Sequence, residues 1–559
     1  MTSDNGKRCR NGLGLALFAL SLGLRLYRLD AEGLWMDEAS QAEFTGDRFV
    51  RLFWWARGML PHGPLPALIC YPFTHYFNSD FMWRLPHALL GAGSVYFLYA
   101  FLAAETELLV AVLAALLMAF NPLHLALSQE LRPYAGSIFF TCLSLWAYGN
   151  AYRRWRTGNS TSLKAITWIN LFGLLNFVWH GLWMIAQALH VIAVAQADKE
   201  WDKRRRYVYS TARSLALSSV PWLVWFFVLR TGDVGVTPPP AESFAAALWR
   251  GITALSGGDA WYAIFQLSFL IVGATWLIAT RRIISAIGSL IFLLPLLGVP
   301  IVLDYCKPFF FHPRQILNIL PAFAALSAMG IVELAGVFKL QWVRAAMAPL
   351  ALAAMIGTTC ATTGLYIYRE HKPAALRGWI EKQARSSENL GPVLVLNCHG
   401  HTYRTFSIYC RRYFIEPPNI VEPDIGRVMN KAAPITTAQA LDRQLYTKLR
   451  ESRDTRGVLI CFDLFDFPNS AEALRADLQK VPFVADILIE RNVLAILLRA
   501  PDRGQPLDWL DSVVAIEARV PEVYEHRVKL RLLRALLPRS AAWDEWDKKI
   551  DGALKKYGY

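Results

Sequence analysis

The N-terminal two-thirds of the chain is a succession of apolar segments, each long enough to cross a bilayer. A helix needs about 20 mostly apolar residues to span about 30 Å of hydrocarbon. Eleven segments fit this description, with ends defined to within about four residues. The predicted spans are residues 13–29, 83–103, 108–125, 134–151, 165–179, 182–195, 214–229, 261–280, 285–303, 317–336 and 345–366.

Composition agrees with a polytopic α-helical membrane protein. Of the 559 residues, 54% are hydrophobic and only 18% are charged, whereas a soluble domain carries about 25% charged residues. These values exclude collagen-like, disordered and small disulfide-rich proteins. The formal charge of +14 does not indicate a nucleic-acid partner, because Lys and Arg collect in the cytoplasmic loops of membrane proteins and face anionic headgroups.

Basic residues predict the orientation of the chain. Lys7, Arg8 and Arg10 precede the first span, and the loops after the fourth, sixth, eighth and tenth spans are also basic, so these parts are predicted to be cytoplasmic. No small-residue cleavage site follows the first apolar segment, which we therefore interpret as a span and not as a signal peptide. An odd number of spans then places the loop 29–82 and the C-terminal region on the periplasmic face of a bacterial inner membrane.

Two domains are predicted, a transmembrane domain at residues 1–366 and a periplasmic α/β domain at residues 367–559. The second domain is expected to contain strands at 393–396 and 458–462, because both are short apolar runs. Further expected elements are a hairpin at 484–498, helices at 437–451 and 470–480, and a basic amphipathic tail at 520–537. That tail either packs on the domain as a solvated helix or lies on an anionic surface.

Four cysteines fall in the stretches predicted to be non-cytoplasmic, where a disulfide is chemically possible. They are Cys306, Cys398, Cys410 and Cys461. Cys398 and Cys410 are the preferred pair if a bond forms, although a free buried thiol is the preferred state of each.

The loop after the first span contains the most informative motif. Asp37 and Glu38 stand side by side after Trp35 at the expected edge of the bilayer. Ionisable groups are costly at this depth and are functional candidates by default. The alternative is structural: Asp37 could cap a helix over residues 43–57, with Glu38 favoured by the helix dipole.

Further polar residues occur in the loops predicted to lie on the same side of the membrane. His62 leads to Arg84 at the start of the second span, and Glu130 and Arg132 lead to Tyr134 at the start of the fourth. Acidic and basic groups are therefore expected to meet in one cavity. Such a group of side chains can remove a proton from an acceptor and stabilise a phosphate leaving group.

Taken together, these motifs resemble the GT-C glycosyltransferases that use a polyprenyl-phosphate sugar, a group that includes protein O-mannosyltransferases and the lipid A aminoarabinose transferase. The resemblance extends over about residues 13–340, with the motifs in the same order and at similar spacing. The motifs are Leu34-Trp35-x-Asp37-Glu38-Ala39, His62-Gly63-Pro64-Leu65, Arg84-Leu85-Pro86, Glu130-x-Arg132-x-Tyr134 and Pro313-Arg314-Gln315 with the residues that follow to Pro321.

The resemblance implies a role for each matched position. Asp37 would be the catalytic carboxylate that activates the acceptor hydroxyl, with Glu38 and Glu130 as the other catalytic acids. Direct displacement of the phosphate would invert the anomeric centre. The residues predicted to bind substrate are Arg132, Tyr134, Arg314, Lys307, His62 and Arg84, of which Arg84 could instead anchor the end of a span.

The sequence also departs from the family pattern. Some members have a basic residue just after the Asp-Glu pair or just before the proline of the second motif, where this chain has Ser40-Gln41 and His62-Gly63. Many relatives have Tyr where this chain has Gln315. Contacts with the donor phosphate are therefore expected to differ in detail.

A divalent metal is a possible cofactor. His62, His124 and His180 fall at the outer face, and with Glu38 and Glu130 they would offer nitrogen and oxygen ligands. Their spacing is not diagnostic, and interfacial histidines commonly hydrogen-bond to helix ends.

The predicted partners are the lipid bilayer, a polyprenyl-phosphate-linked sugar and an acceptor that is a glycolipid such as lipid A, a polysaccharide or a protein. The main alternative is a transporter or flippase of a lipid-linked or anionic substrate, which would need charged or broken helices near the middle of the bilayer. A non-catalytic scaffold is a further alternative, but it would not need Asp37 and Glu130 at the mouths of neighbouring spans.

Overall fold

The computed structural model contains two compact units. The helical unit comprises Met1–Ala31 and Gln41–Arg369, and the sheet unit comprises Glu32–Ser40 and Glu370–Tyr559. The C-terminal unit thus includes a nine-residue stretch that the sequence analysis assigned to the transmembrane domain. The structure describes residues 3–46, 63–157, 163–197, 201–225, 227, 243–306, 312–337, 341–362, 374–386, 393–397, 403–413, 419–421, 457–463, 471–490 and 493–499.

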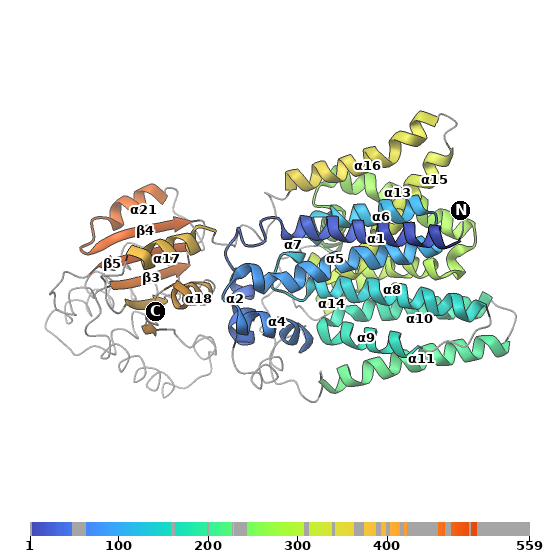
Figure 1. Ribbon diagram of the computed structural model, residues 1–559, viewed down its shortest axis with the longest axis horizontal. Coiled ribbons are helices and arrows are strands. Elements are labelled where there is room, and N and C mark those ends of the chain that lie inside the picture. Colours follow the sequence, from blue (N-terminus) through green and yellow to red (C-terminus); the bar gives the residue numbers. More distant parts are fainter. Residues whose placement is uncertain are drawn as a thin grey trace. The chain divides into compact units, whose positions relative to one another are not determined.

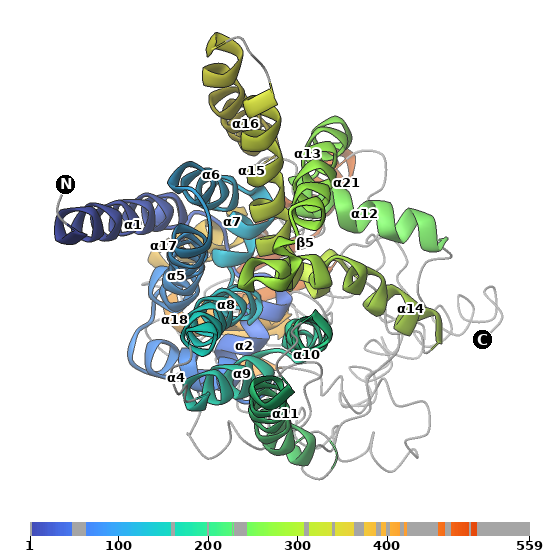
Figure 2. The same ribbon diagram turned by 90° about the vertical axis from the view of Figure 1, so that its right-hand side faces the viewer.

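The helical unit is a bundle whose longer helices run roughly side by side (Figures 1 and 2). Short 3-10 segments, labelled η, interrupt it between α9 and α10 and on both sides of α14. The described elements from the N-terminus to α11 are α1 (Ser3–Leu26), α2 (Met36–Gly46), α4 (Leu65–Tyr76), α5 (Asp80–Glu105), α6 (Leu108–Ala119), α7 (Pro122–Ser128), α8 (Tyr134–Arg156), α9 (Lys164–Asn176), η1 (Val178–His180), α10 (Gly181–Ala197) and α11 (Trp201–Val224). Those that follow are α12 (Phe244–Ser256), α13 (Ala260–Ala279), η3 (Arg282–Ile284), η4 (Ala286–Leu293), η5 (Pro295–Leu297), α14 (Gly298–Cys306), η6 (Pro313–Ile319), α15 (Leu320–Val337) and α16 (Gln341–Thr362).

Several of these helices are long and apolar enough to cross a membrane, as expected for a multi-pass membrane protein. Among the described residues five pass by length and composition, and α6 with α7 would form a sixth span bent by 59°. The other predicted spans overlap α1, α8, α9, α11 and α16. Of these helices, α9 is short, with 13 residues, and the others include turns with charged or polar residues. The five are Asp80–Glu105, Val178–Ala197, Ala260–Ala279, Ala286–Cys306 and Pro313–Val337.

The bend between α6 and α7 has a local cause. Pro122 has no backbone N–H and cannot continue the hydrogen-bond ladder of α6, so a new helix begins there. Asn121 caps this helix, because its side chain accepts a hydrogen bond from the backbone N–H of His124 at 2.9 Å. The third predicted span therefore ends in a short helix that points in a new direction, towards the loop that carries Glu130.

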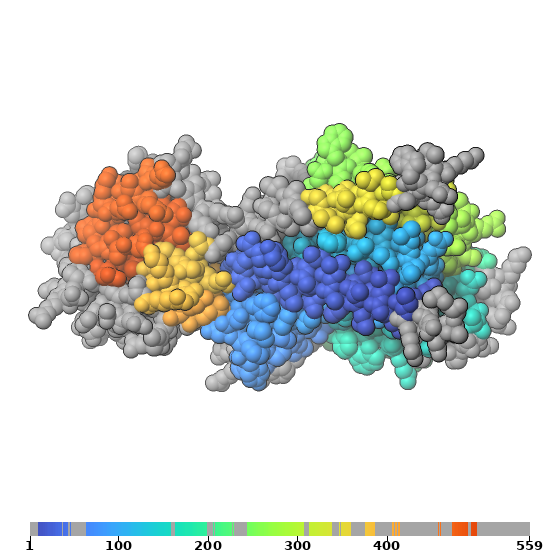
Figure 3. Space-filling view, turned by 45° about the horizontal axis from the view of Figure 1, so that its top comes forward, coloured from blue at the N-terminus to red at the C-terminus, as the bar shows by residue number. Residues whose placement is uncertain are grey.

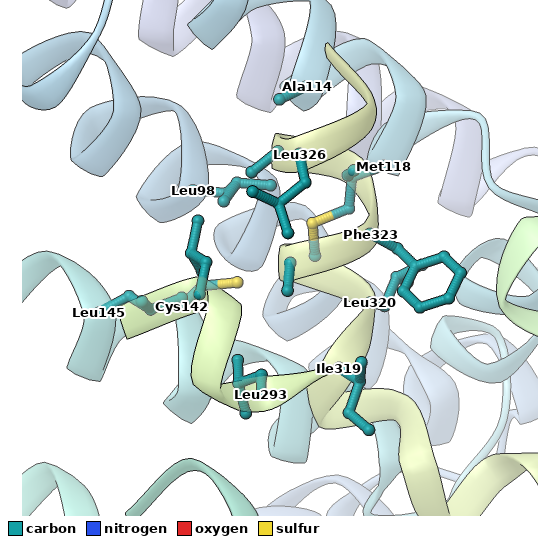
Figure 4. Close-up of a cluster of buried hydrophobic side chains, with 14 of the residues drawn as sticks. Leu98, Ala114, Met118, Cys142, Leu145, Leu293, Ile319, Leu320, Phe323 and Leu326 are labelled. Carbon is teal, nitrogen blue, oxygen red and sulfur yellow. The ribbon is translucent and has the colours of Figure 1, made fainter. Parts of the chain in front are cut away.

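Close packing holds the bundle together. Leucine, methionine and phenylalanine side chains from α5, α6, α8, η4, η6 and α15 form one buried cluster (Figure 4). Glycines let α13 and α15 approach closely: a Cβ atom on Gly273 would lie 2.1 Å from the carbonyl oxygen of Leu326, and one on Gly330 would lie 1.9 Å from that of Phe269. Small residues at helix contacts are typical of membrane bundles, where lipid supplies no hydrophobic force between helices.

The sheet unit contains a five-stranded sheet in the order β2-β1-β3-β5-β4. Strand β1 pairs in parallel with β2 and β3, and β5 pairs antiparallel with β3 and β4. Helices α17, α18 and α21 pack around it (Figure 1). The bounds are α17 (Ala374–Ser386), β1 (Val393–Asn397), α18 (Tyr403–Tyr413), β2 (Asn419–Val421), β3 (Gly457–Asp463), α21 (Ala471–Leu478), β4 (Val484–Glu490) and β5 (Val493–Arg499).

Several sequence predictions for this region are confirmed. The two apolar runs form β1 and β3, the hairpin is β4 with β5, and the helix predicted at 470–480 is α21. Cys306 is an exposed free thiol, and Cys410 is buried. Cys398, the helix predicted at 437–451 and the basic tail at 520–537 lie outside the described residues.

Candidate active site

The two adjacent carboxylates lie in the first turn of α2. Glu38 is fully buried, and its Oε2 accepts a hydrogen bond from the backbone N–H of Trp35 at 3.3 Å, whereas Asp37 is half-buried. The helix begins at Met36, several residues before the helix that Asp37 was considered to cap, so Asp37 is inside the first turn. Acidic side chains are common in this position, because the first turn carries the partial positive charge of the helix N-terminus.

The segment Glu32–Ser40, which we call the acidic segment, is fastened to α18 by two hydrogen bonds. The backbone N–H of Leu34 donates to the Tyr409 hydroxyl at 2.7 Å, and the Thr405 hydroxyl donates to the Leu34 carbonyl at 3.1 Å. All three residues are fully buried. Thr405 and Tyr409 are one turn apart on α18, so they lie on one face of the helix. Together they bind the backbone N–H and the carbonyl of Leu34.

The second outer loop, residues 129–133 between α7 and α8, is fastened to the end of α1. The Gln129 side-chain amide donates to the carbonyls of Arg25 and Tyr27 at 3.0 and 2.9 Å. Within the loop, the backbone N–H of Arg132 donates to the Glu130 carbonyl at 2.8 Å. Both charged side chains are buried, with exposed fractions of 1% for Glu130 and 5% for Arg132.

Two guanidinium groups converge on one aromatic ring. The Cζ atoms of Arg132 and Arg314 lie 5.8 and 5.6 Å from the ring centroid of Tyr134, which is itself buried. Arginines at this distance are attracted by the electron-rich face of the ring. We call Arg132, Arg314 and the Tyr134 ring the cation cluster. It brings together, inside the helical unit, three residues that the sequence analysis predicted to bind substrate.

A capping box positions Arg314. The Nδ1 atom of His312 accepts a hydrogen bond from the Arg314 backbone N–H at 3.2 Å, and the Gln315 side chain accepts one from the His312 backbone N–H at 3.1 Å. Burial, with the positive charges of Arg314 and Arg250, holds the pKa of His312 well below its ordinary value. His312 is therefore neutral, as an Nδ1 acceptor must be.

Arg250 was not identified from the sequence. It lies on α12, and its charge acts on His312 together with that of Arg314, which adds a third cation to this region of the helical unit. The only signal in the sequence was a charged residue within the apolar helix Phe244–Ser256, and no motif of the family pointed to it.

Cys70 of α4 and His87 of α5 are in contact, and Cys70 lies within electrostatic range of Arg132 in the second outer loop. The thiol of Cys70 lies 3.2 Å from Nε2 of His87 and also hydrogen-bonds to the Gln41 side chain. Burial raises the pKa of the Cys70 thiol to about 12, so it is a neutral group and not a nucleophilic thiolate.

The remaining predicted residues have varied surroundings. Arg84 is buried and donates to the carbonyl of Leu29 at 3.0 Å, a contact that joins the start of α5 to the end of the first span. This contact agrees with the anchoring alternative, while its substrate-binding role stays a prediction. His62 and Lys307 lie outside the described residues.

The histidines considered as metal ligands have separate hydrogen-bond partners in the interior. His124 bonds to Arg25 at 2.8 Å and to Ser94 at 3.1 Å, and His180 bonds to Asn170 at 3.2 Å. Within the part of the chain that the structure describes, no three His, Cys, Asp or Glu side chains are grouped closely enough to hold a metal ion. We therefore derive no metal-dependent step, and a metal site that uses His62 stays a prediction.

Comparison with known proteins identifies the fold. No protein-family model matches the chain, and no curated protein matches it by sequence. Among solved structures, ArnT from Cupriavidus metallidurans in the apo state matches with a TM-score of 0.54 at 12% identity, over 89% of this chain and 99% of that one. ArnT is a lipid A aminoarabinose transferase of the GT-C type. This chain has the GT-C fold.

The same neighbour matches in a second state. ArnT from Cupriavidus metallidurans bound to undecaprenyl phosphate gives a TM-score of 0.53 at 12% identity, over 88% of this chain and 99% of that one. The likeness thus includes nearly the whole of ArnT and extends beyond the helical unit of this GT-C chain. The GT-C fold predicted from the short motifs is confirmed, although the identity is too low to carry over any residue's role.

Proposed function

We propose that the chain is an integral membrane glycosyltransferase that moves a sugar from a polyprenyl-phosphate donor to an acceptor, with inversion at the anomeric carbon. The observation that carries this proposal is the cation cluster, in which arginines from two distant parts of the chain share one buried ring. It occurs in a GT-C fold whose solved neighbour was crystallised with undecaprenyl phosphate. A phosphate is the ligand that such a pair of guanidinium groups binds best.

In this proposal the cation cluster stabilises the leaving group. The bond between the anomeric carbon and the donor phosphate oxygen breaks, and negative charge develops on the departing polyprenyl phosphate. Arg132 and Arg314, with Arg250 nearby, would stabilise that charge through donors that are already in place. His312 would keep Arg314 oriented, because the capping box fixes the backbone on which Arg314 is carried.

Asp37 is proposed as the general base. It would take the proton of the acceptor hydroxyl while that oxygen forms its bond to the anomeric carbon, so that the acceptor gains the sugar and the phosphate leaves. The Asp37 side chain lies in the first turn of α2 and is half-buried, so it keeps access to an acceptor from solvent. Glu38 would support Asp37, because its carboxylate accepts a hydrogen bond from the Trp35 backbone and so stabilises the first turn of α2. Glu130 would act as a further catalytic acid from the second outer loop.

The finer topology is part of the same proposal. Eleven spans, a cytoplasmic N-terminus and a periplasmic α/β domain at residues 367–559 would place the reaction on the outer face of a bacterial inner membrane. The transferred unit would be a hexose or a pentose. The basic loops that follow the fourth, sixth, eighth and tenth spans support this orientation.

The deciding experiment is transfer of radiolabelled sugar from a panel of polyprenyl-phosphate donors to a membrane extract. The wild type should release polyprenyl phosphate and label an acceptor, and Asp37→Asn at matched expression should do neither. If Asp37→Asn is as active as the wild type, Asp37 is not the base. If no donor is consumed by the wild type but a lipid-linked substrate crosses the bilayer, the chain is a transporter.

A further inference from the structure

A buried polar contact joins η6 to α8, the elements that carry Arg314 and Tyr134 of the cation cluster. The Ser137 hydroxyl donates to Oδ1 of Asn318 at 2.6 Å, and the Thr141 hydroxyl lies 3.3 Å from the same oxygen. Asn318 follows Arg314 by four residues in η6, and Ser137 follows Tyr134 by three in α8. The contact is therefore next to the place where the Arg314 guanidinium lies over the Tyr134 ring.

The spacing along the two elements agrees with this arrangement. Tyr134, Ser137 and Thr141 lie on one face of α8, because residues three and four apart on a helix are neighbours. Ser137 and Thr141 are about 4.5 and 10.5 Å further along the helix than Tyr134. Asn318 is about 8 Å further along η6 than Arg314, since a 3-10 helix rises about 2 Å per residue. The face of α8 that carries the Tyr134 ring therefore also receives Asn318.

The Ser137 hydroxyl is the stronger of the two links. A hydroxyl has one proton, and that of Thr141 has two other partners within reach, the Ser137 carbonyl at 3.0 Å and Nδ1 of His180 at 3.3 Å. The 2.6 Å between the Ser137 hydroxyl and Asn318 is within the ordinary range for a bond between two oxygens. Removal of the Ser137 hydroxyl should therefore weaken the contact more than any other single change on α8.

The contact lies in an apolar interior. Ser137, Thr141 and Asn318 are all fully buried. Ile319 and Cys142, the neighbours of two of them, belong to the apolar cluster of Figure 4. The outer surface of the helical unit is formed by other helices, among them α1, which is dark blue in Figure 3. A buried polar group that loses its partner in such surroundings has no solvent to replace it, so the bond is retained.

Packing alone does not explain an asparagine at this position. Nδ2 of Asn318 is buried and has no hydrogen-bond partner among the residues that the structure describes. An unsatisfied amide in an apolar interior costs free energy, which a leucine of similar volume would avoid. The asparagine is explained by its other end, where Oδ1 attaches η6 to α8.

We propose that Asn318 is a positioning residue, which holds η6 against α8 so that the Arg314 guanidinium stays over the Tyr134 ring. The inference rests on the proposed function, in which the cation cluster stabilises the departing phosphate. The capping box of His312 fixes the backbone within η6, whereas Asn318 fixes η6 itself to the helix that carries the ring. Donors that are held in place before the reaction need no rearrangement as charge develops on the phosphate.

The test removes each partner of the bond in turn. Ser137→Ala removes the donor, and Asn318→Leu removes the acceptor with little change in side-chain volume. Ser144→Ala is the matched control, because Ser144 is a fully buried serine on the same face of α8. Its hydroxyl bonds to Asn170 of α9 at 2.7 Å and to Gln187 of α10 at 3.1 Å. The full-length protein is reconstituted in nanodiscs with a radiolabelled polyprenyl-phosphate sugar and a membrane extract as the source of acceptor.

Ser137→Ala and Asn318→Leu should each lower kcat/KM for the donor about fivefold, the effect of one lost buried hydrogen bond, and Ser144→Ala should stay within about twofold of the wild type. The decisive measurement combines Ser137→Ala with Arg314→Lys. A lysine on its flexible stem depends less on where η6 lies, so the double variant should be within about twofold of Arg314→Lys alone. Thermal unfolding of each purified variant checks that the bundle is intact, and Ser137→Ala keeps the test valid if Asn318→Leu unfolds.

Three results would overturn the inference and leave the proposed function standing. If the losses in the double variant multiply, Ser137 stabilises the bundle independently of Arg314. Wild-type kcat/KM in both Ser137→Ala and Asn318→Leu would show that the contact has no effect on the reaction. An equal loss in Ser144→Ala would show that any buried hydroxyl of α8 matters as much. Failure of the wild type to consume any donor would instead remove the proposed function.

Discussion

The cation cluster and the acidic segment are positioned in different ways. Arg132 is carried by the second outer loop and Arg314 by the first turn of η6, and both are anchored within the helical unit, by Gln129 and by the capping box of His312. Asp37 and Glu38 follow Leu34, which is held by two side chains of α18. The leaving-group side of the proposed reaction thus depends on the membrane bundle, and the base side on the C-terminal unit. Variants that affect one side alone test this difference.

The largest effect is expected from the base. Asp37→Asn keeps the size of the side chain but cannot take a proton, so the rate of transfer should fall about a thousandfold. Transfer of radiolabelled sugar by purified protein measures this. Glu32→Gln, in the same acidic segment, is the control and should retain activity; a similar loss there would point to a general effect of charge and not to general base catalysis.

The next largest effect is expected from the cation cluster. Arg314→Lys keeps the charge but loses the planar fork, and it should lower kcat/KM for the donor about a hundredfold. Arg282→Lys is matched chemically, because Arg282 lies 4.8 Å from the Trp276 ring but has no proposed role. If Arg314→Lys and Arg282→Lys are equally active, the cation cluster does not take part in the reaction.

A smaller effect should come from the anchor of the acidic segment. Tyr409→Phe removes the hydroxyl that accepts from Leu34, a hydrogen bond that contributes about 1 kcal/mol, and should lower kcat about fivefold without changing the KM for the donor. Tyr413→Phe, one turn further along α18, is the control. A rise in KM with kcat unchanged would show that α18 does not act through the acidic segment.

The smallest effect concerns pH and the capping box. In the folded protein the pKa of His312 lies well below its ordinary value of 6.5, so protonation favours the unfolded state. The contribution of the cap to stability is complete above about pH 6.5 and decreases as the pH falls below it. His312→Asn, which caps without titrating, should reduce the loss of thermal stability between about pH 6.5 and pH 5.

The matched control for this comparison is His75→Asn, since His75 is an exposed histidine of α4. Thermal unfolding of both variants is measured at the same pH values, so that the effect of replacing a histidine by asparagine elsewhere is known. An unaltered slope in His312→Asn would show that the cap does not titrate in this range.

Local patterns accounted for the elements, and short motifs accounted for part of the site. The hairpin of β4 and β5 follows from two alternating or apolar runs around a polar pair, because strand pairing at this range needs few residues. Arg132, Tyr134 and Arg314 were selected through their motifs, and the structure brings all three together. Arg250 was missed because a lone arginine in an apolar helix carries no local sign of what it faces.

What the sequence alone determined is the membrane-spanning character of the chain, the placement of its helices and strands, and the residue types available for chemistry. These depend on hydropathy and on neighbours within about one or two turns. Only the tertiary structure decided that α18 holds Leu34 and that two arginines share the Tyr134 ring. Such contacts join residues hundreds of positions apart, and their geometry is set by the packing of the whole chain, which no local pattern encodes.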